Sequence, residues 1–248
     1  MRQIKMILSV GLVLILSLAL FGESTRGYAQ SASFITSKPI PSWGTIVGTQ
    51  DKVVNLSKGE VVYVQLEPGK TVKPGDRFTL LQVGQTMNHP LTGEEMGRLV
   101  TNPGELVIVE GKDRIVTAKV RQSFKPILRG DYILTPAPVR AEAGPTRSLK
   151  KIEGRIIFTL EGIENISSNE LVFIDRGSQD GVIVGTPFRI YQLSDDFDEN
   201  LKDDPSLLPL NRVGRAVVVA VQEKTSTALI TRSSQGIHIG DQAISGQE

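Results

Sequence analysis

Apolar residues recur along most of the chain in short, β-branched runs separated by turn residues. The runs that alternate or stay apolar over strand length are residues 60–66, 77–81, 106–109, 115–120, 170–174, 188–191, 216–221 and 227–231. Pro-Gly, Gly-Lys, Gly-Asp and Asp-Gly pairs between them favour tight turns. No window after the N-terminal region has the helical apolar period. The pattern therefore predicts an all-β chain of short strands, as in sandwiches and barrels.

The N-terminal region has a different pattern. It starts with Arg2 and Lys5, continues as one apolar run, and ends in small residues that include Gly27 and Ala29. This order is typical of a secretory signal, which we place at residues 1–29 with cleavage after Ala29. The run is short for a bilayer span, which takes roughly 20 residues. An uncleaved anchor is the alternative. We expect a periplasmic protein with no transmembrane span after signal cleavage.

The chain repeats itself at a shift of 110 positions. Residues 44–82 and 154–192 form 39 ungapped pairs, of which 11 are identical. The identical residues in the first half are Gly44, Ile46, Thr49, Asn55, Ser57, Glu60, Val62, Val72, Gly75, Phe78 and Gln82. Gly130-Asp131 and Gly240-Asp241 restore the same shift near the ends. Gly97-Arg98 and Gly214-Arg215 match at an offset of 117, which predicts compensating insertions in the middle loops.

This duplication defines the predicted domain organisation. The segments are a signal peptide at 1–29, an extended lead-in at 30–43, a first β module at 44–136, a linker at 137–153 and a second β module at 154–248. The linker is rich in proline, which favours an extended spacer. Closure into a barrel of about six strands would leave no exposed edges in so small a module. We therefore predict two tandem, small β-barrel-like modules joined by a Pro-rich linker after an N-terminal signal helix.

Composition excludes several classes of function. The chain has 28 Lys and Arg against 27 Asp and Glu, so no overall positive field favours nucleic acid as a partner. It has no cysteine, which excludes a disulfide framework, a cysteine nucleophile and a thiolate zinc site. The modules must be held together by packing alone. The 24 glycines and 13 prolines suit a fold with many turns.

Two segments match part of a binding loop. Residues 67–71 read like the end of a phosphate-binding loop, but Val64 stands where a glycine is needed and no helix can follow. We interpret them as a turn. Residues 196–200 open like a calcium loop, but Leu201 stands where a glycine is needed. We interpret the acidic segment 195–204 as a solvated insertion, with loose cation binding or partner contact as alternatives.

The remaining polar candidates do not form a catalytic or metal-binding set. His89 and His238 occupy non-equivalent positions without enough neighbouring ligands for zinc. Asp131 and Asp241 recur after glycine, which is typical of turns. The basic stretch 140–155 fits a linker, with contact to anionic glycan or lipid as the alternative. No serine lies in a Gly-x-Ser-x-Gly elbow. We predict no enzyme activity, no cofactor, and no catalytic, cofactor-binding or metal-binding residue.

The repeated block itself resembles a known kind of module. Its pattern is Asn-Leu/Ile-Ser-x-x-Glu, then an apolar strand, a turn and Val-x-x-Gly-x-x-Phe, and it is clearest near residues 172–185. It resembles the C-terminal β modules of LysM-associated bacterial envelope proteins and is similar to the C-terminal domain of flagellar assembly protein T. Residues 89–97 also resemble a loop of the LysM-associated group. No LysM segment is present, so neither glycan binding nor family site residues carry over.

The resemblance implies a non-enzymatic, exported cell-envelope protein. Its expected role is that of a structural or protein-binding module in a periplasmic assembly, associated with the cell wall or with a flagellum or other appendage. Expected partners are envelope proteins, with peptidoglycan or a basal-body component as candidates. The alternative is a ligand-binding protein or a hydrolytic enzyme with its site in the cleft between the two modules.

Overall fold

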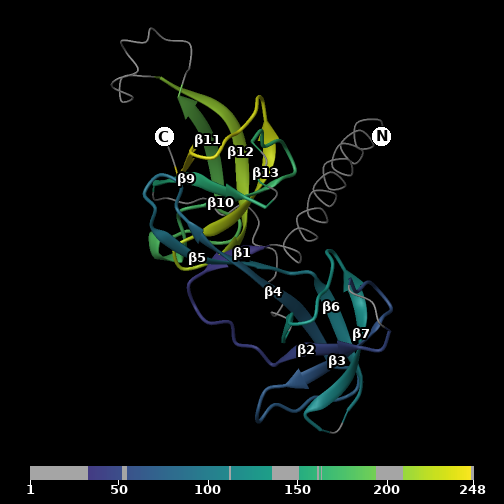
Figure 1. Cartoon of the computed structure of the whole chain (residues 1–248). Helices are drawn as coiled ribbons and strands as arrows, with labels where there is room; N and C mark the ends of the chain where they lie inside the picture. The colour runs from purple at the N-terminus through teal and green to yellow at the C-terminus, as the bar shows by residue number, and fades with distance from the viewer. Residues whose placement is uncertain are drawn as a thin grey trace, which may run out of the picture.

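A computed structural model describes residues 33–51, 55–111, 113–135, 151–160, 162, 164–193 and 209–246. The expected signal peptide, most of the expected linker and the acidic segment 195–204 lie outside these residues. The described part consists of strands and turns with one short 3-10 helix, η1 (Ser178–Asp180) (Figure 1). Within it, no helix has the length and apolar character needed to cross a membrane.

The first module is a closed barrel with an extra hairpin. Its strands are β2 (Gly44–Thr49), β3 (Val61–Leu66), β4 (Arg77–Asn88), β5 (Glu95–Thr101), β6 (Gly104–Glu110), β7 (Ile115–Ser123) and β8 (Tyr132–Leu134). The barrel order is β2-β3-β7-β6-β4-β8, and β8 pairs back to β2. Strand β4 continues past the barrel and pairs there with β5. The short strand β1 (Phe34–Thr36), from the lead-in, adds to the outer edge of β5.

The second module is a barrel with the same strand order. Its strands are β9 (Ile152–Thr159), β10 (Leu171–Ile174), β11 (Pro187–Leu193), β12 (Leu210–Val221), β13 (Ser226–Ser233) and β14 (Gln242–Ser245). They close as β9-β10-β13-β12-β11-β14. The prediction of two tandem, six-stranded β-barrel modules is therefore confirmed.

The two barrels also share their irregularities. The register of β2 against β3 shifts at Val47, and that of β9 against β10 shifts at Ile157. The register of β6 against β7 shifts at Val109, and that of β12 against β13 shifts at Val219. Each pair is separated by the repeat distance of 110. A β-bulge changes which residues face outward, so the matching bulges give the two barrels the same outward-facing positions.

The prediction of compensating insertions is wrong. Gly214 is equivalent to Gly104, not to Gly97, because the register around both follows the shift of 110. A β-carbon on Gly104 would lie 2.2 Å from the carbonyl oxygen of Gln122, and one on Gly214 would lie 2.9 Å from that of Arg232. Gly97 serves a different purpose: its φ is 118°, and a β-carbon there would lie 2.4 Å from the backbone of Thr36 in β1.

Each barrel has its own apolar core. Residues such as Val62, Phe78 and Leu106 fill the first, and Val172 and Phe188 belong to the set that fills the second. Burial of such side chains contributes about 1.5–3 kcal/mol each relative to exposure. Trp43 packs at the start of the first barrel. Its ring centroid lies 5.6 Å from that of Phe78.

Repeated polar residues close turns. The backbone N–H of Ser57 donates to Glu60, and that of Ser167 donates to Glu170. Asp131 accepts from Leu128 N at 2.8 Å and from Gln82 at 3.2 Å. Asp241 accepts from His238 N at 2.8 Å and from Gln192 at 2.7 Å. The shared polar residues therefore serve the same local hydrogen bonds in both modules.

Candidate functional site

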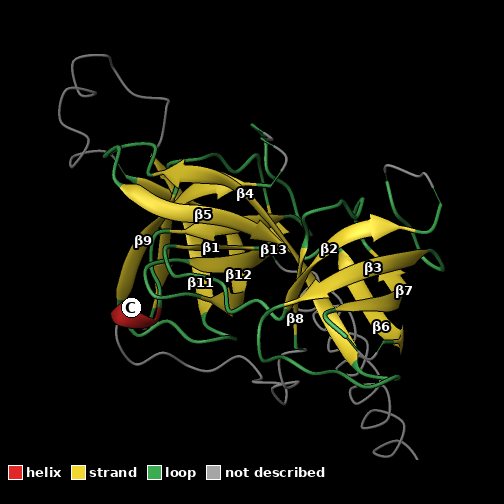
Figure 2. Ribbon diagram, turned by 60° about the horizontal axis from the view of Figure 1, so that its bottom comes forward, coloured by secondary structure: helices red, strands yellow, loops and turns green. Residues whose placement is uncertain are grey.

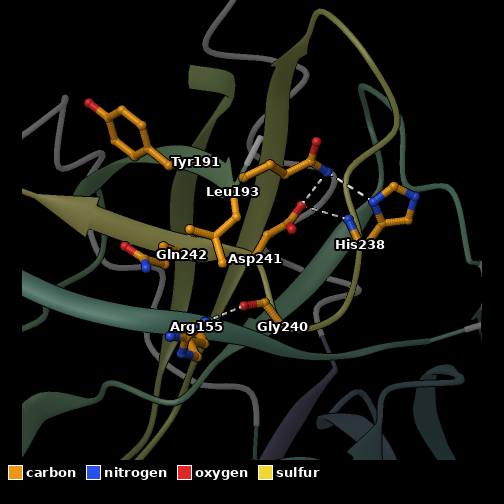
Figure 3. Close-up of a pocket in the computed structure, with 8 residues that line it drawn as sticks. Arg155, Tyr191, Leu193, His238, Gly240, Asp241 and Gln242 are labelled. Carbon is orange, nitrogen blue, oxygen red and sulfur yellow. Dashed lines mark hydrogen bonds between the residues drawn. The ribbon is translucent and has the colours of Figure 1, made fainter. Parts of the chain in front are cut away.

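A small pocket on the second module is lined mainly by polar residues (Figure 3). Its volume is about 240 Å³, below the roughly 300–1,000 Å³ of ordinary ligand sites. The residues that line it are Arg155, Tyr191, Gln192, Leu193, His238, Gly240, Asp241 and Gln242. All eight belong to one module, so this pocket is not a site between the two barrels.

The polar groups of this pocket are engaged with one another. Gln192 Nε2 donates to Asp241 at 2.7 Å and lies 2.9 Å from His238 Nδ1. Arg155 Nη1 donates to the carbonyl oxygen of Gly240 at 2.8 Å. The Gln192–Asp241 bond has its counterpart in Gln82–Asp131 of the first module, where Leu128 stands in place of His238. These contacts hold a turn that both barrels contain.

The turn at residues 67–71 borders a larger pocket, of about 750 Å³, on the first module. Gly69 has a φ of 79° there, and Lys70 Nζ lies 4.7 Å from the centroid of the Trp43 ring. A cation over an indole face is a favourable pair. Lys70 therefore packs on an aromatic ring within this turn, in line with the interpretation as a turn and not as a phosphate-binding loop.

The two modules meet through an apolar contact. Strand β4 leaves the first barrel and reaches the second, with β1 and β5 beside it (Figures 1 and 2). Phe173 on β10 has no exposed surface, and Ile157 on β9 is 5% exposed. They form one cluster with side chains from β1, β4 and β5, namely Ile35, Met87, Met96 and Leu99. The hairpin of the first module and the lead-in strand thus cover one outer face of the second barrel.

Polar groups fix the position of this contact. Thr225 Oγ1 donates to the carbonyl oxygen of Ile35 at 3.0 Å, and Thr227 Oγ1 donates to that of Ser33 at 2.7 Å. His89, at the hairpin turn, has its Nε2 atom 3.4 Å from Asp175 Oδ2. Its Nδ1 accepts backbone N–H groups of the same turn, so the imidazole is held between the hairpin and the second barrel.

Two exposed ion pairs lie at the edge of the contact. Lys224 Nζ lies 2.7 Å from Glu94 Oε1, and Lys38 Nζ lies 2.6 Å from Glu223 Oε2. The hydrogen bond and charge of Lys224 lower the pKa of Glu94, and Glu94 raises the pKa of Lys224. The hydrogen bond from Lys38 is the main cause of the lowered pKa of Glu223. Exposed pairs contribute little to stability, so their main effect here is on orientation.

The corresponding face of the first barrel is exposed, as far as the described residues show. Tyr63, Val47, Ile115 and Val109 lie on the adjacent strands β3, β2, β7 and β6, at the repeat positions of Phe173, Ile157, Thr225 and Val219. They are 36%, 42%, 58% and 50% exposed, respectively. Their counterparts in the second module are at most 7% exposed. An exposed apolar group spanning four adjacent strands is typical of a binding surface.

We call this surface the outer face of the first module, defined by Val47, Tyr63, Val109, Ile115 and Thr117. The sequence contained its residues but gave no sign of it, because Tyr63 and Phe173 have the same place in similar strands. Only the folded structure reveals the face, through the exposure of its residues, with Val47 and Val109 at the bulge positions. In the described ranges, no cluster of three or more His, Cys, Asp or Glu side chains could hold a metal ion.

The basic stretch predicted at the linker is described only in part. Lys151 pairs with Glu153, and Arg155 belongs to the pocket turn described above. Arg140, Arg147 and Lys150 lie outside the described residues, as does the acidic segment 195–204. Comparison of the chain with protein-family models and with curated proteins finds no match in either set.

Proposed function

We propose that this chain is a non-enzymatic, exported protein of the cell envelope that acts as a structural, protein-binding module in a periplasmic assembly. The observation that supports a binding role is the outer face of the first module. Tyr63, Val109 and Ile115 expose apolar surface on neighbouring strands, while the same face of the second barrel is buried against protein. Burial of such apolar area is the usual driving force for protein association.

Two further observations agree with a binding role. The interior of each barrel is filled with apolar side chains. The polar residues that both modules share, such as Gln82 and Gln192, make structural hydrogen bonds at turns. The N-terminal apolar run and the resemblance to envelope modules support export and an envelope location.

The test is retention of envelope proteins on the immobilised chain. We expect the original chain and the Ile183→Lys variant to retain the same protein, and the Tyr63→Lys variant to lose it. Ile183 is a matched control because it is 50% exposed but lies on the other module, away from the outer face. Sedimentation with purified cell wall accompanies this assay. Binding to protein-free wall that persists in Tyr63→Lys would contradict a protein-binding role for this face.

A further inference from the structure

The chain shows within itself what covers a face of this kind. The outer face of the second barrel is covered by the β4–β5 hairpin and by β1, which belong to the preceding module and its lead-in. The covered face and the covering hairpin are both parts of the repeated unit. Within the described part of the chain, the equivalent face of the first module is exposed and the equivalent strands of the second module, β11 and β12, cover no further barrel.

The two faces match in detail as well as in position. Tyr63 replaces Phe173 and Val47 replaces Ile157, so aromatic and β-branched side chains stay in place. Thr117 is equivalent to Thr227, whose hydroxyl donates to the backbone of the covering strand. The face of the first module can therefore offer the same apolar contacts and one of the same hydroxyl donors.

The second module has the strands of the same hairpin. Leu193 pairs with Leu210 as Val83 pairs with Val100, and the same number of residues separates the partners in each module. Val100 is fully buried, and β1 pairs with it through Phe34. Leu193 and Leu210 are 37% and 39% exposed. The hairpin strands of the second module thus end in apolar residues that the described chain leaves open to solvent.

Charge favours the same match. The face of the first module is bordered by Arg114 and Lys119, both exposed. The sequence between Leu193 and Leu210 is acidic. Within the chain, Lys224, the counterpart of Arg114, pairs with Glu94 of the covering hairpin. An acidic sequence opposite a basic border repeats this pairing of opposite charges.

We propose that the outer face of the first module binds the β11–β12 end of the second module of another copy of this chain. The contact is head-to-tail, because each copy contributes a different surface. Contacts of this type build rings or open filaments and do not stop at a symmetric dimer. The inference rests on the proposed protein-binding role and identifies the partner as the chain itself.

The first measurement is the oligomeric state of the purified chain over a range of concentrations, by analytical ultracentrifugation. We expect species larger than a dimer to grow with concentration. Ile115→Lys is expected to abolish them, whereas the control Ile183→Lys is not. A chain that stays monomeric at all concentrations would overturn the inference. A monomeric chain could still retain an envelope protein, with Tyr63→Lys abolishing that retention. The proposed function would then stand although the self-association fails, so the two failures are distinguishable.

Cross-linking tests the geometry. The chain has no cysteine, so Ile115→Cys and Leu210→Cys each introduce a single thiol. We expect a short bismaleimide to join a chain carrying Ile115→Cys to one carrying Leu210→Cys when the two are mixed. Neither variant alone should give a comparable yield. A product that forms equally well from Ile115→Cys alone would indicate a symmetric contact between first modules and would contradict the head-to-tail arrangement.

Discussion

Phe173 and Tyr63 occupy the same position in two barrels of the same topology, yet only Phe173 is buried. Phe173 pairs with Phe158 and Thr227, and Tyr63 pairs with Gly48 and Thr117. Phe173 is covered by the hairpin of the first module, whereas Tyr63 is 36% exposed. The repeat therefore contains its own comparison, because the same aromatic position is covered by a hairpin in the second module and exposed in the first.

Replacement of these two residues should have very different costs. We expect Phe173→Ala to lower the free energy of unfolding by about 3–5 kcal/mol, because it leaves a cavity between the modules. Tyr63→Ala should cost less than about 1 kcal/mol, because exposed positions away from special features tolerate change. Chemical denaturation at low protein concentration measures both. Equal costs would contradict the burial difference.

Gly104 marks a close approach of β6 and β7. A β-carbon there would lie 2.2 Å from the carbonyl oxygen of Gln122, which the backbone pairing holds in place. We expect Gly104→Ala to destabilise the first module by about 1–3 kcal/mol or more, as overpacking does. Gly48→Ala is the control, because the atoms nearest to its β-carbon would belong to the exposed side chain of Tyr63, at 3.2 Å and beyond. Thermal unfolding of the two variants tests the difference. Equal melting temperatures would argue against the strand register.

Asp131 should make stability depend on pH. Burial raises its pKa above the ordinary value of 3.8, and the hydrogen bonds from Leu128 and Gln82 only partly oppose this. A group with a raised pKa favours the folded state most at low pH, and this contribution is lost as pH rises through the raised value. We expect Asp131→Asn to gain stability relative to the original chain as the pH rises above 3.8 toward neutral, because the original chain then loses the contribution of its protonated carboxyl group. Denaturation at several pH values measures it. A constant difference would contradict the burial of this carboxyl group.

Cleavage between the modules should not separate them. Limited proteolysis near residues 137–148 is expected to give two folded fragments, as the Pro-rich sequence predicts. The fragments should elute together, because Phe173, Ile157 and Met87 remain in one apolar cluster. Size-exclusion chromatography of the cleaved chain measures this. Elution as two separate fragments would show that the contact depends on the covalent connection.

Much of the fold could be predicted from sequence, because the duplication repeats local requirements. Glycines such as Gly75 and Gly185, with φ of 94° and 91°, recur because a turn needs them in both modules. The same signal misled where it rested on a two-residue match. Gly97-Arg98 resembled Gly214-Arg215, but the glycine that the barrel needs is Gly104, beside the backbone of the next strand.

The contact between the modules could not be predicted. Whether an outward-facing residue such as Ile157 or Val47 is covered depends on a hairpin and a lead-in strand that pair far from it in sequence. Residues 30–43 read as an extended lead-in, and nothing local shows that Ile35 lies against Thr225. Long-range contacts of this kind are fixed by tertiary packing and not by local propensity.

Thiol reactivity at matched positions tests most directly whether one face is bare and its counterpart covered. Ile115→Cys and Thr225→Cys place one thiol at equivalent sites, of which the first is 58% exposed and the second 1%. At low protein concentration, a maleimide should modify the thiol at position 115 rapidly and the thiol at position 225 far more slowly. Equal rates at the two positions would contradict the covered second face, and with it the difference between the two modules.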